Sequence, residues 1–164
     1  MYRIMFFALI LLLPSFAHAD DFNGYRGTTW GMSRSEVIDV LKKQGLKYST
    51  GLKTLTVKDN LFGKKATITY HVGFLNPLTE VEISLYSDQH DLPAKEITNS
   101  MLEKYGRLDD MVCGDNTPAG YLCFANWLLP KTAIKYTANP TFIDITYTYS
   151  NEADEKKKDI KNKL

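Results

Sequence analysis

The feature that most constrains the fold of this chain is a strict alternation of apolar and polar residues between positions 65 and 86. Every second position is apolar in two successive stretches: Ala66, Ile68, Tyr70, Val72 and Phe74, then Val81, Ile83 and Leu85. A period of two places such residues on one face of a strand. Asn76-Pro77 provides the turn between the stretches. We therefore expect an antiparallel hairpin whose one face is apolar, with Phe74 pointing inward, and whose other face is polar.

Four further stretches are strand candidates. Residues 54–59 precede the hairpin, whereas residues 120–129, 132–138 and 141–149 follow much later. Asn139-Pro140 joins the last two strands, as Asn76-Pro77 joins the first pair. The sequence thus predicts about six strands, in two groups of three.

A helix is predicted before each group of strands. Ser33 and Glu36 have the spacing of a capping box, and Gly45 provides a stop for the first helix. The second helix is expected to use Asp91 as its cap and to end before Gly106. Apolar residues recur at helical spacing in both segments.

This order of elements predicts an α+β fold. We expect an antiparallel sheet of about six strands with two helices packed on one face, a plan consistent with a tandem α-β-β-β repeat. The opposite face would present polar and aromatic side chains to solvent or to a partner. The candidate binding residues on it are Thr69, His71, Glu80, Glu82 and Tyr86. Trp30 is expected either to cover one end of the core or to contact a partner.

The N-terminal residues 1–19 have the features of a secretory signal peptide. Arg3 is followed by an apolar run from Ile4 to Leu13, and Ala17-His18-Ala19 has the form of a cleavage site. The run is shorter than the ~20 residues that span a membrane, and no cysteine follows the site to carry a lipid. We expect cleavage after Ala19, one domain over residues 20–150, a charged tail over residues 151–164, and a periplasmic or secreted location.

Charge and cysteine content narrow the possible partners. Arg3 is the one Lys, Arg, Asp or Glu in residues 1–19, so the remaining chain carries as many basic as acidic residues. A neutral chain argues against a nucleic-acid binder and against a polybasic membrane adaptor, and the short N-terminal run argues against a stable membrane anchor. Cys113 and Cys123 are the only two cysteines, and in an exported chain they are expected to form one disulfide. Their spacing is not that of a thioredoxin motif.

No recognised catalytic motif occurs in the sequence. It contains no Gly-x-Ser-x-Gly elbow, no His-Glu-x-x-His motif and no phosphate-binding glycine loop, and no cofactor or metal site is expected. His71, Glu80 and Glu82 could form a metal or acid–base cluster, but alternation of charges on a solvated face also explains them. We therefore expect a non-enzymatic protein, with a small hydrolase or a metal-site enzyme as the remaining alternative.

Two features resemble known families. The stretch "GMSRSEV", residues 31–37, is similar to the helix start of the small outer-membrane-assembly lipoproteins of the SmpA/OmlA group. The tandem helix-plus-strands plan over residues 30–150 resembles that of the β-lactamase inhibitory protein, which grips its enzyme with a sheet face. The resemblance implies a protein-binding domain outside the cytoplasm, either an inhibitor or immunity-type protein or an envelope structural or assembly factor.

Overall fold

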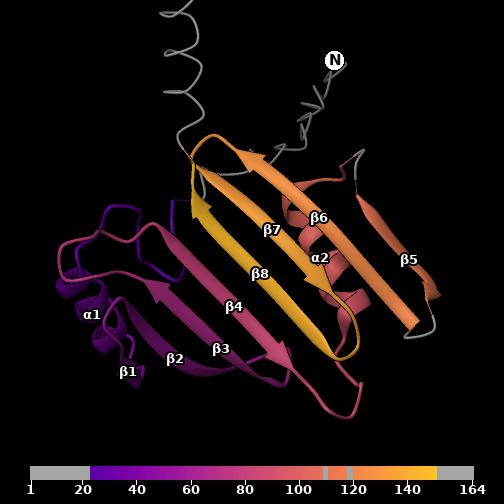
Figure 1. Ribbon diagram of the computed structural model, residues 1–164, viewed down its shortest axis with the longest axis horizontal. Helices are drawn as coiled ribbons and strands as arrows, with labels where there is room; N and C mark the ends of the chain where they lie inside the picture. The colour runs from indigo at the N-terminus through magenta and orange to yellow at the C-terminus, as the bar shows by residue number, and fades with distance from the viewer. Residues whose placement is uncertain (1–22, 109–110, 118–119, 151–164) are drawn as a thin grey trace, which may run out of the picture.

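Each half of the chain folds as one helix followed by four antiparallel strands (Figure 1). The computed structural model describes residues 23–108, 111–117 and 120–150. The first half contains α1 (Arg34–Lys43), β1 (Tyr48–Thr50), β2 (Thr54–Leu61), β3 (Lys64–His71) and β4 (Glu80–Tyr86). The second half contains α2 (Ala94–Tyr105), β5 (Val112–Thr117), β6 (Gly120–Leu129), β7 (Thr132–Ala138) and β8 (Phe142–Tyr149). The α+β class is as predicted.

The strands form one sheet in the order β1-β2-β3-β4-β8-β7-β6-β5. Every neighbouring pair is antiparallel, and the last strands of the two halves meet at the centre, where Ile83 lies opposite Ile145. Exchanging the two halves leaves this order unchanged. The repeated unit is therefore a helix with four strands.

The sheet has eight strands, so the expectation of about six is wrong. The two strands that the sequence did not indicate are β1 and β5, which form the two edges of the sheet. β1 has only three residues, and β5 contains Gly114, Asp115 and Asn116, which are typical of turns. These strands form because their backbones pair with β2 and β6, and not because of an amphipathic pattern.

Both helices pack on the same face of the sheet. Val37 and Leu41 of α1, and Ile97 and Met101 of α2, belong to one buried cluster with the inward residues of the central strands. The Thr98 and Tyr136 hydroxyls lie 2.8 Å apart and join α2 to β7. Burial of these side chains is the main source of stability for such a domain.

The ends of the two helices differ. In α1 the predicted capping box is present: the Ser33 N–H donates to the Glu36 carboxylate at 2.7 Å, and the Ser33 hydroxyl accepts from the Glu36 N–H. Gly45 follows α1 with φ of 69°, as a left-handed stop requires. The expectation for Asp91 is wrong, because α2 begins at Ala94 and its N-cap position is Pro93. Asp91 instead accepts hydrogen bonds from Lys64 and Ser87, which lower the pKa of its carboxyl group.

Phe74 does not point into the core, contrary to the prediction. β3 ends at His71, and the Gly73 N–H donates to the Asn76 carbonyl in the following loop. The period of two no longer applies once the backbone leaves the sheet, so the Phe74 side chain is exposed. Val72 is still buried, and the inward face of the hairpin is otherwise as expected.

The predicted signal peptide and the charged tail over residues 151–164 lie outside the described residues. Within the described residues, neither helix is long and apolar enough to cross a membrane.

Candidate functional site

The sheet face opposite the helices carries most of the candidate binding residues. We call it the open face, because neither described helix covers it. It consists of the outward side chains of six neighbouring strands. These are Thr54, Thr56 and Lys58 of β2; Lys65, Thr67, Thr69 and His71 of β3; Glu80, Glu82, Ser84 and Tyr86 of β4; Phe142, Asp144, Thr146 and Thr148 of β8; Ala133, Lys135 and Thr137 of β7; and Leu122, Phe124, Asn126 and Leu128 of β6.

The strand register brings four of the predicted residues together. His71 lies directly opposite Glu80, and Thr69 lies opposite Glu82 in the next row. His71 Nε2 is 3.3 Å from Glu80 Oε1 and 3.6 Å from Glu82 Oε2, although this nitrogen makes no aligned hydrogen bond. The Thr148 hydroxyl donates to Glu80 Oε2 at 3.4 Å. The result is a half-exposed acidic cluster around one imidazole, which forms ion pairs only when His71 is protonated.

Tyr86 lies at the opposite end of β4 from this cluster. Its side chain is exposed and borders a shallow hollow on the open face together with Lys58 and Lys65. Thr67 and Ser84 also line this hollow, and Lys58 Nζ donates to the Thr67 hydroxyl at 2.7 Å. The predicted set therefore spans two regions of β3 and β4: the acidic cluster at one end and, at the other, a hollow whose lining includes Lys58, Lys65 and Asp59.

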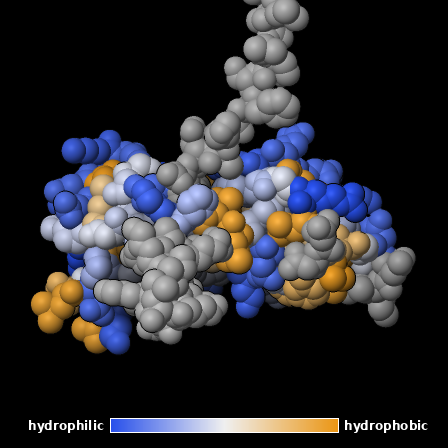
Figure 2. Space-filling view, turned by 90° about the horizontal axis from the view of Figure 1, so that it is seen from above, coloured by the Kyte–Doolittle hydropathy of each residue, from blue (hydrophilic) through white to orange (hydrophobic). Residues whose placement is uncertain are grey.

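An apolar patch on the second half of the open face was missed by the sequence analysis. Val112 lies opposite Phe124 across the β5–β6 pair, and Leu128 lies on the same face of β6. All three side chains are exposed. The strand at residues 120–129 contains apolar residues at both parities, so its sequence alone does not show which of them face outward. Figure 2 shows apolar side chains gathered toward the right, where Figure 1 places β5, β6 and α2.

Trp30 does not lie on the open face. Its indole N–H donates to the Thr132 hydroxyl at 2.9 Å, and its ring packs against the core at the end of the sheet where β7 begins. The adjacent backbone is fixed by two hydrogen bonds, from the Gly31 N–H to the Leu78 carbonyl and from the Leu78 N–H to the Met32 carbonyl. In this position Trp30 covers one end of the core.

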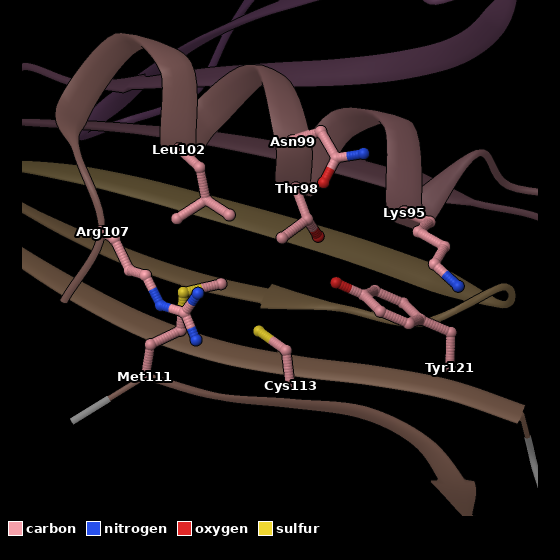
Figure 3. A pocket seen from close by; sticks show the side chains of 8 residues that line it. All are labelled: Lys95, Thr98, Asn99, Leu102, Arg107, Met111, Cys113 and Tyr121. Carbon is pink, nitrogen blue, oxygen red and sulfur yellow. The ribbon is translucent and has the colours of Figure 1, made fainter. Parts of the chain in front are cut away.

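The cysteines form the predicted disulfide, which lies on the helix side of the sheet. Cys113 and Cys123 are directly opposite each other in β5 and β6. Cys113 lines a hollow between α2 and this hairpin; the other lining residues are Lys95, Thr98, Asn99, Leu102, Arg107, Met111 and Tyr121 (Figure 3).

The hollow is lined by two basic side chains, a tyrosine and a disulfide-bonded cysteine, among others. Figure 3 shows the Cys113 sulfur and the Tyr121 hydroxyl pointing into the space between Lys95 and Arg107. Asp115 lies 3.0 Å from Lys95 Nζ and raises the pKa of that ammonium group. Among the described side chains that line the hollow, none is a carboxylate or an imidazole, and the cysteine is oxidised.

The described residues also contain no group of three or more His, Cys, Asp or Glu side chains arranged to hold a metal ion. His71, Glu80 and Glu82 are close in space, but they belong to two adjacent strands of a flat face rather than to a cavity.

No protein-family model, no curated protein and no solved structure matches this chain.

Proposed function

We propose that the chain is an exported, non-catalytic protein-binding domain that acts through its open face. An inhibitor or immunity-type role fits such a domain best. The disulfide between Cys113 and Cys123 supports export, because structural disulfides persist in oxidising compartments. The leader-like residues 1–19 support the same location.

The observation that carries the proposal is the composition of the open face. Protein interfaces combine apolar anchors with a polar, partly charged surround. The open face has such anchors in Phe124 and Leu128, an exposed aromatic in Tyr86, and a charged cluster around Glu82. A face that served only solubility would not need three exposed large apolar side chains on two neighbouring strands.

The test is binding of open-face variants to the partner captured from periplasmic extract. Tyr86→Ala removes a large contact at little cost to the core, and we expect a loss of roughly 2 kcal/mol of binding free energy if Tyr86 is an anchor. Leu128→Ser should weaken binding through loss of apolar contact. Glu82→Lys should slow association with a basic partner, because it reverses a charge near the contact.

Glu103→Lys is the matched control for the charge reversal. Glu103 is exposed on α2, on the helix side of the sheet, so this variant should bind like the parent. All variants must retain the parent melting temperature. If the three open-face variants bind as tightly as the parent, the open face is a solvated surface and the proposal fails. Capture of a membrane-embedded outer-membrane complex in place of one soluble protein would instead favour an assembly factor.

A further inference from the structure

Three large apolar side chains project from one end of the sheet. Leu52, in the turn between β1 and β2, is 76% exposed; Phe74 and Leu75, in the loop between β3 and β4, are 74% and 96% exposed. The two loops adjoin because Thr54 pairs with His71 at the ends of β2 and β3. We call these three residues the apolar tip. Figure 2 shows apolar side chains standing out at its left end, the end at which Figure 1 draws the β3–β4 loop.

The loops that carry the apolar tip are fixed by a buried arginine. Arg34, at the start of α1, is only 9% exposed, and its guanidinium donates to the Val72 and Gly51 carbonyls at 2.7 Å and to the Thr54 carbonyl at 3.2 Å. The Phe74 ring lies over the same guanidinium, 4.9 Å from its centre. Among the described residues, no carboxylate lies within ion-pair distance of Arg34. Its charge is satisfied by the backbone of the two loops.

This arrangement holds the apolar tip in place before any partner is bound. Side chains that are more than 70% exposed contribute little to the core, so the fold itself gains little from them. Binding through ordered loops costs less conformational entropy than binding through mobile ones. A convex, ordered apolar projection is complementary to a concave apolar surface.

The charges beside the apolar tip indicate what kind of surface that is. Lys53 is the single charged residue in residues 51–53 and 72–79. The adjoining row of the open face carries Glu80, and the next row carries Glu82. These carboxylates would be repelled by an anionic lipid surface, but they complement a protein with basic groups around an apolar hollow.

We propose that the apolar tip inserts into an apolar hollow of a folded protein, and that a basic rim of the same protein faces Glu80 and Glu82. This inference rests on the proposed function, because the partner is the one that docks on the open face. The inference specifies the surface chemistry of the partner. It also specifies which end of the sheet anchors the complex.

The experiment places the photo-crosslinker p-benzoylphenylalanine at three positions of the full chain, produced in the cells that contain its partners. Position 75 reports the apolar tip and position 82 reports the open face. Position 103 is the control, because Glu103 is exposed on α2, on the helix side of the sheet. We expect one protein adduct of the same mass from positions 75 and 82, and none from position 103. Peptide mapping should place the position-75 crosslinks among apolar partner residues and the position-82 crosslinks near Lys or Arg.

A double substitution tests the energetic role of the apolar tip. Phe74→Asp with Leu75→Asp should reduce the position-82 adduct by about tenfold or more, as expected for loss of an anchor, while the melting temperature stays unchanged. The inference is overturned if the position-82 adduct survives this substitution. It is also overturned if position 82 gives an adduct and position 75 gives none. Either result leaves the proposed function intact. Absence of adducts from both positions contradicts both.

Two further results would also overturn the inference. An adduct of position 75 with a second copy of this chain would make the apolar tip a self-association site. Co-sedimentation of the parent chain with vesicles of phosphatidylethanolamine and phosphatidylglycerol, abolished by the double substitution, would make it a lipid-binding site. We expect neither.

Discussion

Arg34 shows how far the role of one residue can depend on its surroundings. In the sequence it lies between Ser33 and Glu36, the two members of the capping box, at a position that is commonly exposed in a first helical turn. In the fold it is buried and donates to carbonyl groups of two distant loops. Arginine suits this role because its planar guanidinium presents several donors in fixed directions. One residue thus connects α1 to both loops of the apolar tip.

The capping box makes a prediction about acid stability. Hydrogen bonds from the Ser33 hydroxyl and backbone N–H lower the pKa of the Glu36 carboxyl group below its ordinary value of 4.5. The Glu36 carboxylate therefore contributes its full stabilisation above the ordinary pKa of 4.5. This stabilisation is lost as the pH falls through the lowered pKa. Glu36→Gln should be less stable than the parent at pH 7, and the difference should shrink as the pH falls toward 3. Urea unfolding at a series of pH values measures this.

Ser33→Ala is the matched variant, because it removes the hydroxyl that contributes most to the lowered pKa. We expect it to cost about 1 kcal/mol of unfolding free energy at pH 7 and to weaken the pH dependence. The difference in unfolding free energy between Glu36→Gln and the parent should not stay constant from pH 7 to pH 3. A constant difference would contradict the link between the Glu36 pKa and stability.

Among the elements, β5 is the one most dependent on a covalent bond. Among the described strands it pairs with β6 alone, and its register shifts between Gly114 and Thr117. The disulfide joins residues ten positions apart and holds the two strands together. Changing both Cys113 and Cys123 to Ser should lower the unfolding free energy by roughly 2–3 kcal/mol, since the bridge closes a short loop.

Hydrogen exchange distinguishes a local from a global effect of this change. Exchange should accelerate most in β5 and β6 and least in the central pair β4 and β8, because the bridge is at an edge. The parent protein treated with a thiol reductant should behave like the double variant. Equal acceleration throughout the sheet would show that the bridge supports the whole fold and not one edge.

At the scale of the whole molecule, Trp30 connects the two halves. It precedes α1 in the first half, and its indole N–H donates to Thr132 at the start of β7 in the second half. Thr132 is fully buried, and Trp30 is partly buried. A double-mutant cycle with Trp30→Phe and Thr132→Val should give a coupling energy of about 1 kcal/mol. Additive effects of the two changes on the unfolding free energy would mean that the hydrogen bond does not couple the halves.

The sequence predicted elements whose pattern is local. The alternation from Ala66 to Val72 predicted the buried face of β3, and Ser33 with Glu36 predicted the start of α1. It failed where the outcome depended on a neighbouring element. Phe74 was expected inside because the alternation continues past His71, although the strand does not. β1 and β5 were missed because edge strands need only a partner backbone.

For the candidate site, too, the sequence predicted one part and missed another. The alternation from Thr69 to Tyr86 identified the polar side of the first hairpin, and the register places His71 and Thr69 opposite Glu80 and Glu82 as a hairpin requires. The apolar patch at Val112, Phe124 and Leu128 was not identified, because β6 is apolar on both faces and only α2 shows which face is covered.

By itself, then, the sequence determined the α+β class, the two helices, six of the strands, the disulfide pair and the polar side of the β3–β4 hairpin. These follow from the period of a helix or a strand, from capping and from the pairing of the only two cysteines, all of which act over short distances or through one bond. Only the tertiary structure decided the central pairing of β4 with β8, the burial of Arg34, the exposure of the apolar tip and the outward face of β6. Each of these depends on contacts between segments far apart in the chain, and the free energy of such contacts is not encoded in any one stretch of residues.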